Sequence, residues 1–226
     1  MQGSVVWSEG MFIAPQHFQH LDATVQHYVN EVAQIDLSYG DYGVSELQIN
    51  MERLKVGKIA IREAAGVFPD RLFFRLTKEL IIDIPDGVVE ETVYLAVPLV
   101  ISGAAQFGND DDMVRMVKTR AELRDLNDPT NEPIEAELAN VGVCIRLGSE
   151  DFSGYAAIPI ARILEKTAEG RVSLDRSFIP HALRIQASSV LTERLEEIVS
   201  LARARAANAA GRAAADTGKR SESSLM

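Results

Sequence analysis

Apolar and polar residues alternate along much of the chain between residues 44 and 174. A period of two is typical of half-buried β-strands, because successive side chains of a strand point to opposite faces. Turn-forming residues separate the runs at Gly40, Gly57, residues 66–70 and residues 85–87. The first runs place apolar side chains at Val44, Leu47, Ile49, Leu54, Val56, Ile59, Ile61, Leu72, Phe74, Leu76, Leu80, Ile82 and Ile84.

Residues 93–101, VYLAVPLVI, form a nearly continuous apolar run of strand length, which predicts a strand covered on both faces. Shorter alternating runs follow at residues 141–147, 158–163 and 171–175. Many short strands at close spacing favour an antiparallel β-sandwich over repeated βαβ units. The predicted fold class is therefore mainly β, with residues 1–180 as one sandwich domain that includes an N-terminal helix.

Residues 114–126, VRMVKTRAELRDL, are ambiguous because most of these residue types also suit a helix. The alternation of Val114 and Met116, together with sheet patterns on both sides, favours a strand. We therefore predict a strand in this segment.

A first helix is predicted at about residues 16–34, because Pro15 is well placed to open a helix and apolar residues then recur at steps of three and four. This spacing is typical of one buried helix stripe. The stripe comprises Phe18, Leu21, Val25, Tyr28, Val29 and Val32.

A second helix follows Pro180, where apolar residues step by four, three and four along one seam. We assign it to a helical neck at residues 181–210. Residues 211–226 are rich in Ala, Arg, Gly and Ser and are predicted to form a disordered or frayed tail. The seam, which is the predicted oligomer interface, comprises Leu191, Leu195, Ile198 and Ala202.

Charge and composition exclude several classes of partner. The chain has 33 acidic and 23 basic residues, and no Lys/Arg cluster interleaved with aromatics, so a nucleic-acid partner is not expected. Residues 5–20 are too short and too polar to cross a bilayer and lack the features of a secretory leader, so membrane insertion is not expected either. The single cysteine, Cys144, is predicted to be a small apolar core residue, and the lack of a possible intrachain disulfide suits a reducing compartment.

Three histidines provide the one candidate metal site. His17, His20 and His27 would share a face of the first helix, and histidines so arranged can hold a metal. Against this, no HExxH motif is present and the neighbouring glutamines are poor ligands. We therefore favour polar histidines along a helix edge and predict no metal and no cofactor.

No other motif supports catalysis. The acidic loop at 125–136 fails as a calcium loop, because Thr130 stands where a glycine is needed and Ala136 where a glutamate should close the site; residues 108–112 fail as well. GxSxG, Walker, GxGxxG and Cys-His patterns are all missing from the sequence. The chain is thus predicted not to be an enzyme, although a hydrolase with a carboxylate pair outside any motif stays an alternative.

Five blocks, in order, resemble the amino-terminal part of the bacterial type VI secretion baseplate family TssK, also called ImpJ or VasE. They are VVWSEGMFIAPQHFQH at 5–20, YGVSELQIN at 42–50, GVFPD at 66–70, VYLAVP at 93–98 and VSLDRSFIP at 172–180. Two positions depart from the family pattern, with Tyr42 where Trp is usual and Arg71 where a small residue is more common.

The resemblance implies a homotrimer with a β-sandwich shoulder similar to that of phage receptor-binding proteins, a helical neck and a distal head. Residues 1–226 hold the shoulder and the start of the neck, as in a truncated or shortened chain. In the family, the shoulder binds the wedge made by TssF and TssG, and the head docks onto the membrane complex. The resemblance thus implies a non-enzymatic assembly adaptor with TssF and TssG as partners.

The residues predicted to bind a partner lie in the first block. They are either core residues beneath the sandwich or residues that face a neighbouring subunit. The alternative function is a sandwich-fold carbohydrate- or ligand-binding module, but aromatic residues make up 6% of the chain and do not cluster in its polar loops. The predicted partner-binding residues are Trp7, Met11, Phe12, Pro15 and Phe18.

Overall fold

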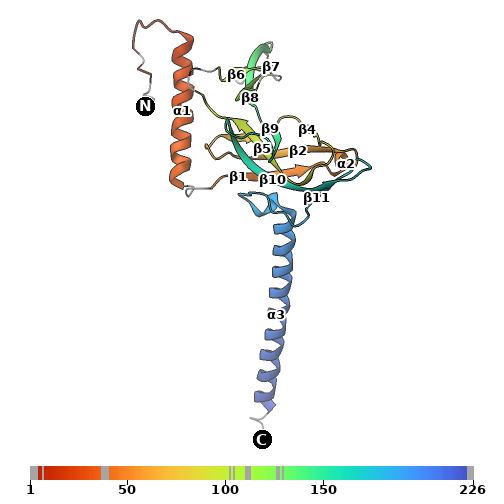
Figure 1. Ribbon diagram of the computed structural model, residues 1–226. Coiled ribbons are helices and arrows are strands. Elements are labelled where there is room, and N and C mark those ends of the chain that lie inside the picture. Colours follow the sequence, from red (N-terminus) through yellow and green to blue (C-terminus); the bar gives the residue numbers. More distant parts are fainter. Residues whose placement is uncertain are drawn as a thin grey trace.

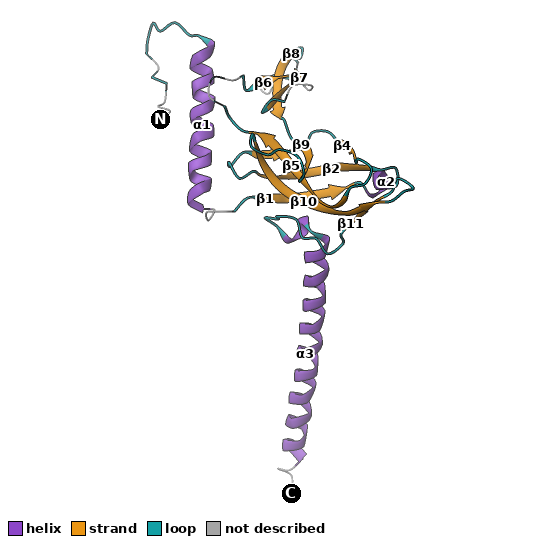
Figure 2. Ribbon diagram, viewed as in Figure 1, coloured by secondary structure: helices purple, strands orange, loops and turns teal. Residues whose placement is uncertain are grey.

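The computed structural model describes residues 5–6, 8–36, 41–101, 103, 105–109, 113–125, 128 and 130–222, and the side chains of these except residues 30, 32–36 and 211–222. Three parts are distinct in Figures 1 and 2: a body of packed sheets, a helix beside it and a long helix that projects from it.

The first sheet is built around β2 (Lys58–Val67), which pairs antiparallel with all three of its partners, β1 (Gly43–Ile49), β3 (Phe73–Arg75) and β4 (Leu80–Asp83). β1 runs along one edge of β2, whereas β3 and β4 lie on the other edge at opposite ends.

The second sheet has the strand order β11–β10–β5–β9, and all its pairs are antiparallel. The strands are β11 (Val172–Leu174), β10 (Tyr155–Lys166), β5 (Val89–Pro98) and β9 (Cys144–Leu147). β5 lies between two partners, and Val93, Leu95 and Val97 are fully buried. The predicted central strand at 93–101 is therefore confirmed, although it begins earlier and ends at Pro98.

The two sheets pack face to face, because one cluster of buried side chains draws members from both. Phe68 and Phe74 form an aromatic pair in this cluster, with ring centroids 4.6 Å apart. The structure confirms the predicted fold class, a mainly β protein of antiparallel sheets. The largest fully buried side chains are Phe68, Phe74, Ile59, Ile61, Ile84, Leu95, Ile158, Ile160, Ile163, Val44, Val93 and Val97.

A third sheet projects from the body and consists of β6 (Phe107–Gly108), β7 (Met116–Leu123) and β8 (Ile134–Val141). β7 and β8 form an antiparallel pair that we call the hairpin, whereas the short β6 pairs with β7 in parallel. The predicted strand in residues 114–126 is thus confirmed. An ion pair fixes the base of the hairpin, since Arg115 Nη2 lies 2.6 Å from Asp70 Oδ2 and Arg115 Nη1 donates to Pro98 O at 2.8 Å.

The neck helix is anchored beneath β1. After β11 the chain runs alongside β1, where Val44 N–H donates to His181 O (2.9 Å) and Leu183 N–H donates to Val44 O (2.8 Å). Gly43 has φ of 135°, and a Cβ there would clash with the carbonyl oxygen of His181. A 3-10 turn, η1 (Ile185–Ala187), then leads into α3 (Ser189–Glu222).

Two predicted strand segments are wrong in detail. Leu54 and Val56 belong to the helical turn α2 (Met51–Leu54) and the turn after it, because the Asn50 side chain caps the helix by accepting from Glu52 N–H at 3.2 Å. Residues 141–147 are two strands, β8 and β9, because the chain leaves one sheet for the other at Gly142. A Cβ at Gly142 would clash with the carbonyl oxygen of Val114.

The predicted helix boundaries also need correction at the C-terminal end. α3 continues to Glu222, whereas the neck was predicted to end at residue 210 and the tail to begin at residue 211; residues 223–226 lie outside the described residues. Alanine has the highest helix propensity, and the many alanines between 206 and 215 therefore extend the helix beyond its apolar seam.

The helix α1 (Pro15–Asp36) matches the predicted range, but its apolar stripe is not buried. α1 stands beside the sheets (Figure 1), and Thr24 is its one buried side chain among those described. The prediction of a buried stripe is wrong for Phe18, Leu21, Val25, Tyr28 and Val29, all of which are exposed, while the side chain of Val32 is outside the described set. None of the helices, as far as they are described, has an apolar stretch long enough to span a bilayer.

Candidate interaction surfaces

The N-terminal segment exposes large apolar side chains ahead of α1 and on its first turn. Phe12 is 95% exposed and Phe18 is 52% exposed, Pro15 is exposed, and Met11 is half-buried. Trp7 lies outside the described residues. Phe12 and Phe18 therefore do not belong to the core of the sandwich.

The candidate metal histidines are not gathered into a site. His17 Nδ1 accepts from Ala14 N–H at 3.0 Å, so this ring serves the start of α1, and His27 Nδ1 lies 3.9 Å from Glu31. Among the described residues, no group of three potential ligands converges. All three histidines lie on α1.

We expect the purified chain to contain no stoichiometric metal, because the histidines do not converge on one point. Elemental analysis after dialysis measures this directly. About one zinc per chain, lost in a His20→Ala variant, would contradict the prediction.

In the acidic loop after β7, the carboxylates of Asp125 and Asp128 accept hydrogen bonds from groups of the same loop. Asp128 Oδ1 accepts from Thr130 N–H and Oγ1 at 3.0 and 2.6 Å, and Asp125 accepts from Asp128 N–H and Asn131 Nδ2. Hydrogen bonds from Thr130 lower the pKa of Asp128. These contacts are those of a self-capped polar turn.

Cys144 is half-buried on β9, and its thiol donates to Ala96 O at 3.5 Å. Burial raises the pKa of the thiol, so it stays protonated at neutral pH and is a poor nucleophile. Its position supports a packing role.

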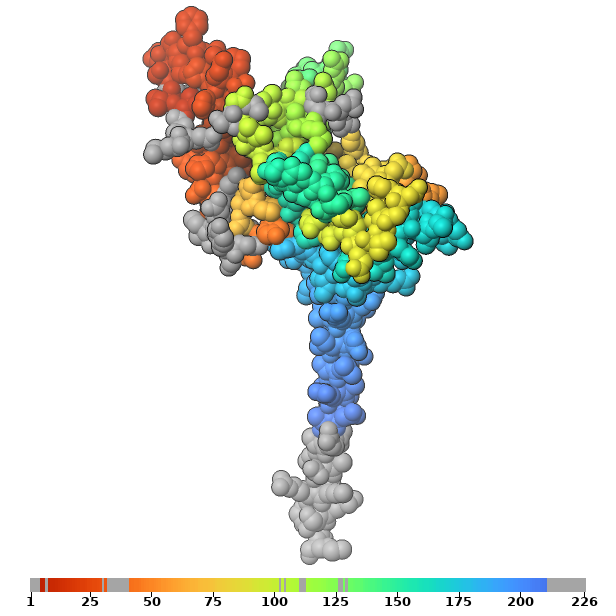
Figure 3. Space-filling view, in the orientation of Figure 1, coloured from red at the N-terminus to blue at the C-terminus, as the bar shows by residue number. Residues whose placement is uncertain are grey.

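The predicted neck seam lies on a helix that projects into solvent. In Figure 3, α3 extends from the body as a single column, and none of the described residues outside the helix covers its length. Leu195 is 42% exposed and Ile198 is 62% exposed, Ala202 is exposed, and Leu191 is half-buried near the body. An exposed apolar seam on a lone helix is typical of a coiled-coil contact.

A groove of about 540 Å³ lies at the root of α3. Leu47 and Ile49 of β1, Phe178 of the linking segment and Val190 of α3 contribute apolar side chains to it, and Asp175, Arg176 and Glu193 contribute charged ones. The four seam residues do not line this groove, so it is a separate surface.

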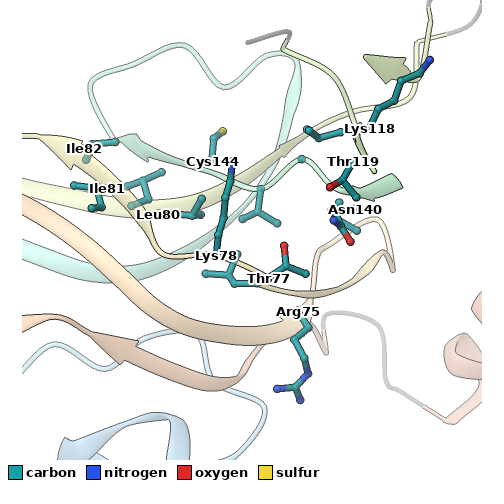
Figure 4. A pocket seen from close by; sticks show the side chains of 16 residues that line it. Arg75, Thr77, Lys78, Leu80, Ile81, Ile82, Lys118, Thr119, Asn140 and Cys144 are labelled. Carbon is teal, nitrogen blue, oxygen red and sulfur yellow. The ribbon is translucent and has the colours of Figure 1, made fainter. Parts of the chain in front are cut away.

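A second hollow, of about 410 Å³, lies between β4, the base of the hairpin and β9 (Figure 4). Leu80, Ile81 and Ile82 form one wall, and Thr119 and Asn140 of the hairpin form another. We call this space the hollow.

Two of the cations that line the hollow form ion pairs. Arg75 donates to both carboxylate oxygens of Glu46, at 2.6 and 3.0 Å, and this lowers the pKa of Glu46. Lys118 lies 3.2 Å from Glu137. Both ion pairs are exposed, so they contribute little to stability. Lys78 lines the hollow as well, so its walls combine apolar, polar and basic side chains.

Sequence reasoning missed the hollow, because its walls come from segments distant in the sequence. The alternation along β7 and β8 was the one available indication. It predicts that one face of the hairpin is apolar, but it does not show which segments lie beside that face.

Comparisons with known proteins agree with the fold. The family model for the bacterial type VI secretion proteins EvfL, ImpJ and VasE matches residues 17–226. The type VI secretion system baseplate component TssK1 of Pseudomonas aeruginosa is 31% identical over 220 residues, which cover 94% of this chain and 49% of the relative. The chain thus spans about half the length of that relative.

Two solved structures are similar in fold. A crystal structure of TssK superposes with a TM-score of 0.84 at 26% identity, over 94% of this chain and 49% of that one. A cryo-electron microscopy structure of a TssK–TssF–TssG baseplate subcomplex contains a chain with a TM-score of 0.80 at 21% identity, over 91% of this chain and 70% of that one.

Proposed function

Because the chain belongs to the VasE family of bacterial type VI secretion proteins, we propose that it is a structural subunit of the secretion baseplate and forms the shoulder and the start of the neck. The observation that carries the proposal is the exposure of large apolar side chains on the N-terminal segment and on α3, at opposite ends of the chain. Such surfaces on a stable sandwich are typical of an assembly protein.

The proposed partners are TssF and TssG. Support comes from the TssK1 relative, a baseplate component, and from the similar chain in the TssK–TssF–TssG subcomplex. Met11, Phe12, Pro15 and Phe18, together with Trp7, form the proposed contact with these partners. Phe12 is the strongest candidate, since an aromatic side chain that is 95% exposed gains the most when a partner covers it.

The proposed oligomer is a homotrimer held in part by α3. The seam of Leu191, Leu195, Ile198 and Ala202 extends over about two heptads, and a helix with one exposed seam is stabilised by identical helices around an axis. Glu196 and Glu197 would then lie outside the seam, where like charges are solvated.

The proposed role is non-enzymatic and cytoplasmic. The self-capped acidic turn, the protonated Cys144 thiol and the dispersed histidines support a binding role over catalysis.

We expect polar substitution of Met11 and Phe12 to remove at least about nine-tenths of the chain retained by tagged TssG after co-expression with TssF, because a buried aromatic anchor contributes about 2 kcal/mol or more to an interface. The melting temperature should barely change, since Phe12 does not pack in the core. Retention on tagged TssG and thermal unfolding of Met11→Ser/Phe12→Ser measure the two effects.

The matched control is Val56→Ser, which replaces another exposed apolar side chain far from the N-terminal segment. It should be retained like the wild type. Equal retention of both variants would exclude the N-terminal contact, and failure of the wild type to bind TssF and TssG would overturn the proposed function.

A further inference from the structure

The hairpin projects from the body as an arm of two strands (Figure 1). β7 and β8 pack on one another and on β6, and in the described part of the chain they make only sparse contact with the other strands. None of the side chains of these two strands, which the structure describes in full, is buried. A two-stranded hairpin alone is marginally stable in water, so the hairpin depends on how its base is held.

Arg115, the residue immediately before β7, holds that base in two ways. Its carbonyl oxygen accepts from Gly142 N–H at 2.8 Å, which joins the two ends of the hairpin. Its guanidinium reaches the body, where Nη2 lies 2.6 Å from Asp70 Oδ2 and Nη1 donates to Pro98 O at 2.8 Å. The main chain of Arg115 thus belongs to the hairpin, whereas its side chain is bound to the body.

The two acceptors of this side chain come from different sheets. Asp70 lies in the turn between β2 and β3 of the first sheet, and Pro98 is the last residue of β5 in the second sheet. A guanidinium is planar and presents its N–H donors in a fixed fork, so it can bond two acceptors at once in one geometry. Through Arg115 the hairpin is therefore fixed relative to both packed sheets.

The carboxylate of Asp70 is itself fixed to the core. Its Oδ1 accepts from Leu72 N–H at 3.3 Å, and Leu72 O accepts at 2.9 Å from the N–H of Phe68, which is fully buried. The Arg115 and Asp70 side chains are 11% and 24% exposed, whereas Arg120, farther along β7, is 78% exposed in its ion pair. A partly desolvated, charge-assisted pair contributes more than an exposed one, so the contact at the base is the stronger of the two.

We propose that these contacts of the Arg115 side chain, here called the Arg115 clamp, set the angle of the hairpin on the body, and that loss of the clamp releases the hairpin as a unit. The two packed sheets should stay folded, because their buried core contains no side chain from β7 or β8, and the half-buried Val141 packs against it only at the base. Gly142, which joins β8 to the body, is the expected pivot, since glycine has the widest range of backbone conformations.

The angle of the hairpin also sets the width of the hollow. Thr119 and Asn140 of the hairpin form one wall of it, and residues 80–82 of β4 form another (Figure 4). The β4 wall is fixed to the first sheet, because β4 pairs with β2 along its whole length. The hairpin wall is held by the Arg115 clamp, so release of the clamp would change the width of the hollow without unfolding the body.

Hydrogen exchange of the full chain tests the clamp. Arg115→Met keeps most of the apolar stem of the side chain but removes both contacts. We expect the amide hydrogens of residues 116–123 and 134–141 to exchange about ten-fold faster or more, because loss of charge-assisted hydrogen bonds raises the population of the released form by about that factor. The amides of β2 and β10 should exchange at the wild-type rate. Mass spectrometry of peptide fragments measures both regions in one sample.

Arg120→Met is the matched control, because it removes an arginine of the same hairpin whose ion pair with Glu135 is exposed. It should accelerate exchange by no more than a few-fold. Equal acceleration of the hairpin in Arg115→Met and Arg120→Met would overturn the clamp, and so would an unchanged rate in Arg115→Met. Acceleration spread evenly over β2, β10 and the hairpin would overturn release as a unit, since Arg115 would then stabilise the whole fold.

Asp70→Asn is the second variant, and it keeps the test open if Arg115→Met does not fold. It is nearly isosteric and retains an oxygen that can accept from Leu72 N–H, but it removes the charge that pairs with Arg115. The hairpin should again exchange faster than the body, and the double variant should exchange no faster than Arg115→Met, because the two residues share one interaction. Wild-type exchange of the hairpin in Asp70→Asn, or effects that multiply in the double variant, would overturn the pairing. Each of these outcomes concerns a single chain, so the proposed baseplate function stands or falls separately.

Discussion

Leu195→Asp is expected to convert the trimer into monomers. In the proposed neck, Leu195 faces the axis between copies, and an unpaired carboxylate buried there costs about 3–5 kcal/mol. The single chain tolerates the change, because Leu195 is 42% exposed on a helix that the body does not cover. Sedimentation velocity across a concentration series measures the shift, and thermal unfolding of the sandwich should be nearly unchanged.

The control for this prediction is Ser200→Asp, which introduces the same charge on the opposite side of α3. It should sediment like the wild type. Equal dissociation by both variants would mean that added charge, and not loss of the seam, weakens the assembly. A Leu195→Asp chain that remains trimeric would show that the seam does not hold the copies together.

Phe68→Ala is expected to destabilise the sandwich more than any surface change. Phe68 is fully buried, and its ring packs against Phe74 at 4.6 Å between centroids. Deletion of a buried aromatic ring costs about 3–5 kcal/mol through lost burial and the cavity that remains. At roughly 2–4 °C per kcal/mol for a domain of this size, the melting temperature should fall by about 6–20 °C.

Phe73→Ala is the matched comparison, because Phe73 neighbours Phe74 on β3 but is 57% exposed. Its melting temperature should fall by no more than a few degrees. Similar losses for Phe68→Ala and Phe73→Ala would contradict the assignment of Phe68 to the core.

The strands were predictable where burial on one face imposes the alternation directly. Ile59, Ile61 and Phe74 were predicted to face inward and are buried in the core. The pattern failed at Leu54, where a local cap from Asn50 stabilises a helical turn, and at Gly142, where the chain changes sheet without losing its alternation. Neither a side-chain cap nor a change of sheet alters the alternation of apolar and polar residues, so the pattern could not predict them.

The apolar face of α1 shows that the spacing of apolar residues in a helix does not predict whether they are buried. Steps of three and four established a helix with one apolar face, but they do not say whether that face is covered by the same chain or by another. In the structure, Val25 and Val29 are exposed, so the helix was predicted correctly but the burial of its apolar face was not.

The two residues that depart from the family pattern, Tyr42 and Arg71, both make contacts in the structure. Tyr42 stacks on His181, with ring centroids 4.0 Å apart, and this contact joins the residue before β1 to the segment before the neck. Arg71 has φ of 69°, a region in which a small residue such as glycine is less strained, and its guanidinium donates to Asp41 O. Neither contact was predictable from local sequence, because each joins segments far apart in the chain.

The mass of the complex formed on co-expression with TssF and TssG tests the central claim most directly. Native mass spectrometry should show this 24.8 kDa chain in the complex as a unit of three copies, and Leu195→Asp should abolish the threefold unit. A complex that contains TssF and TssG without this chain, or that retains it as a single copy or a pair, would contradict the account.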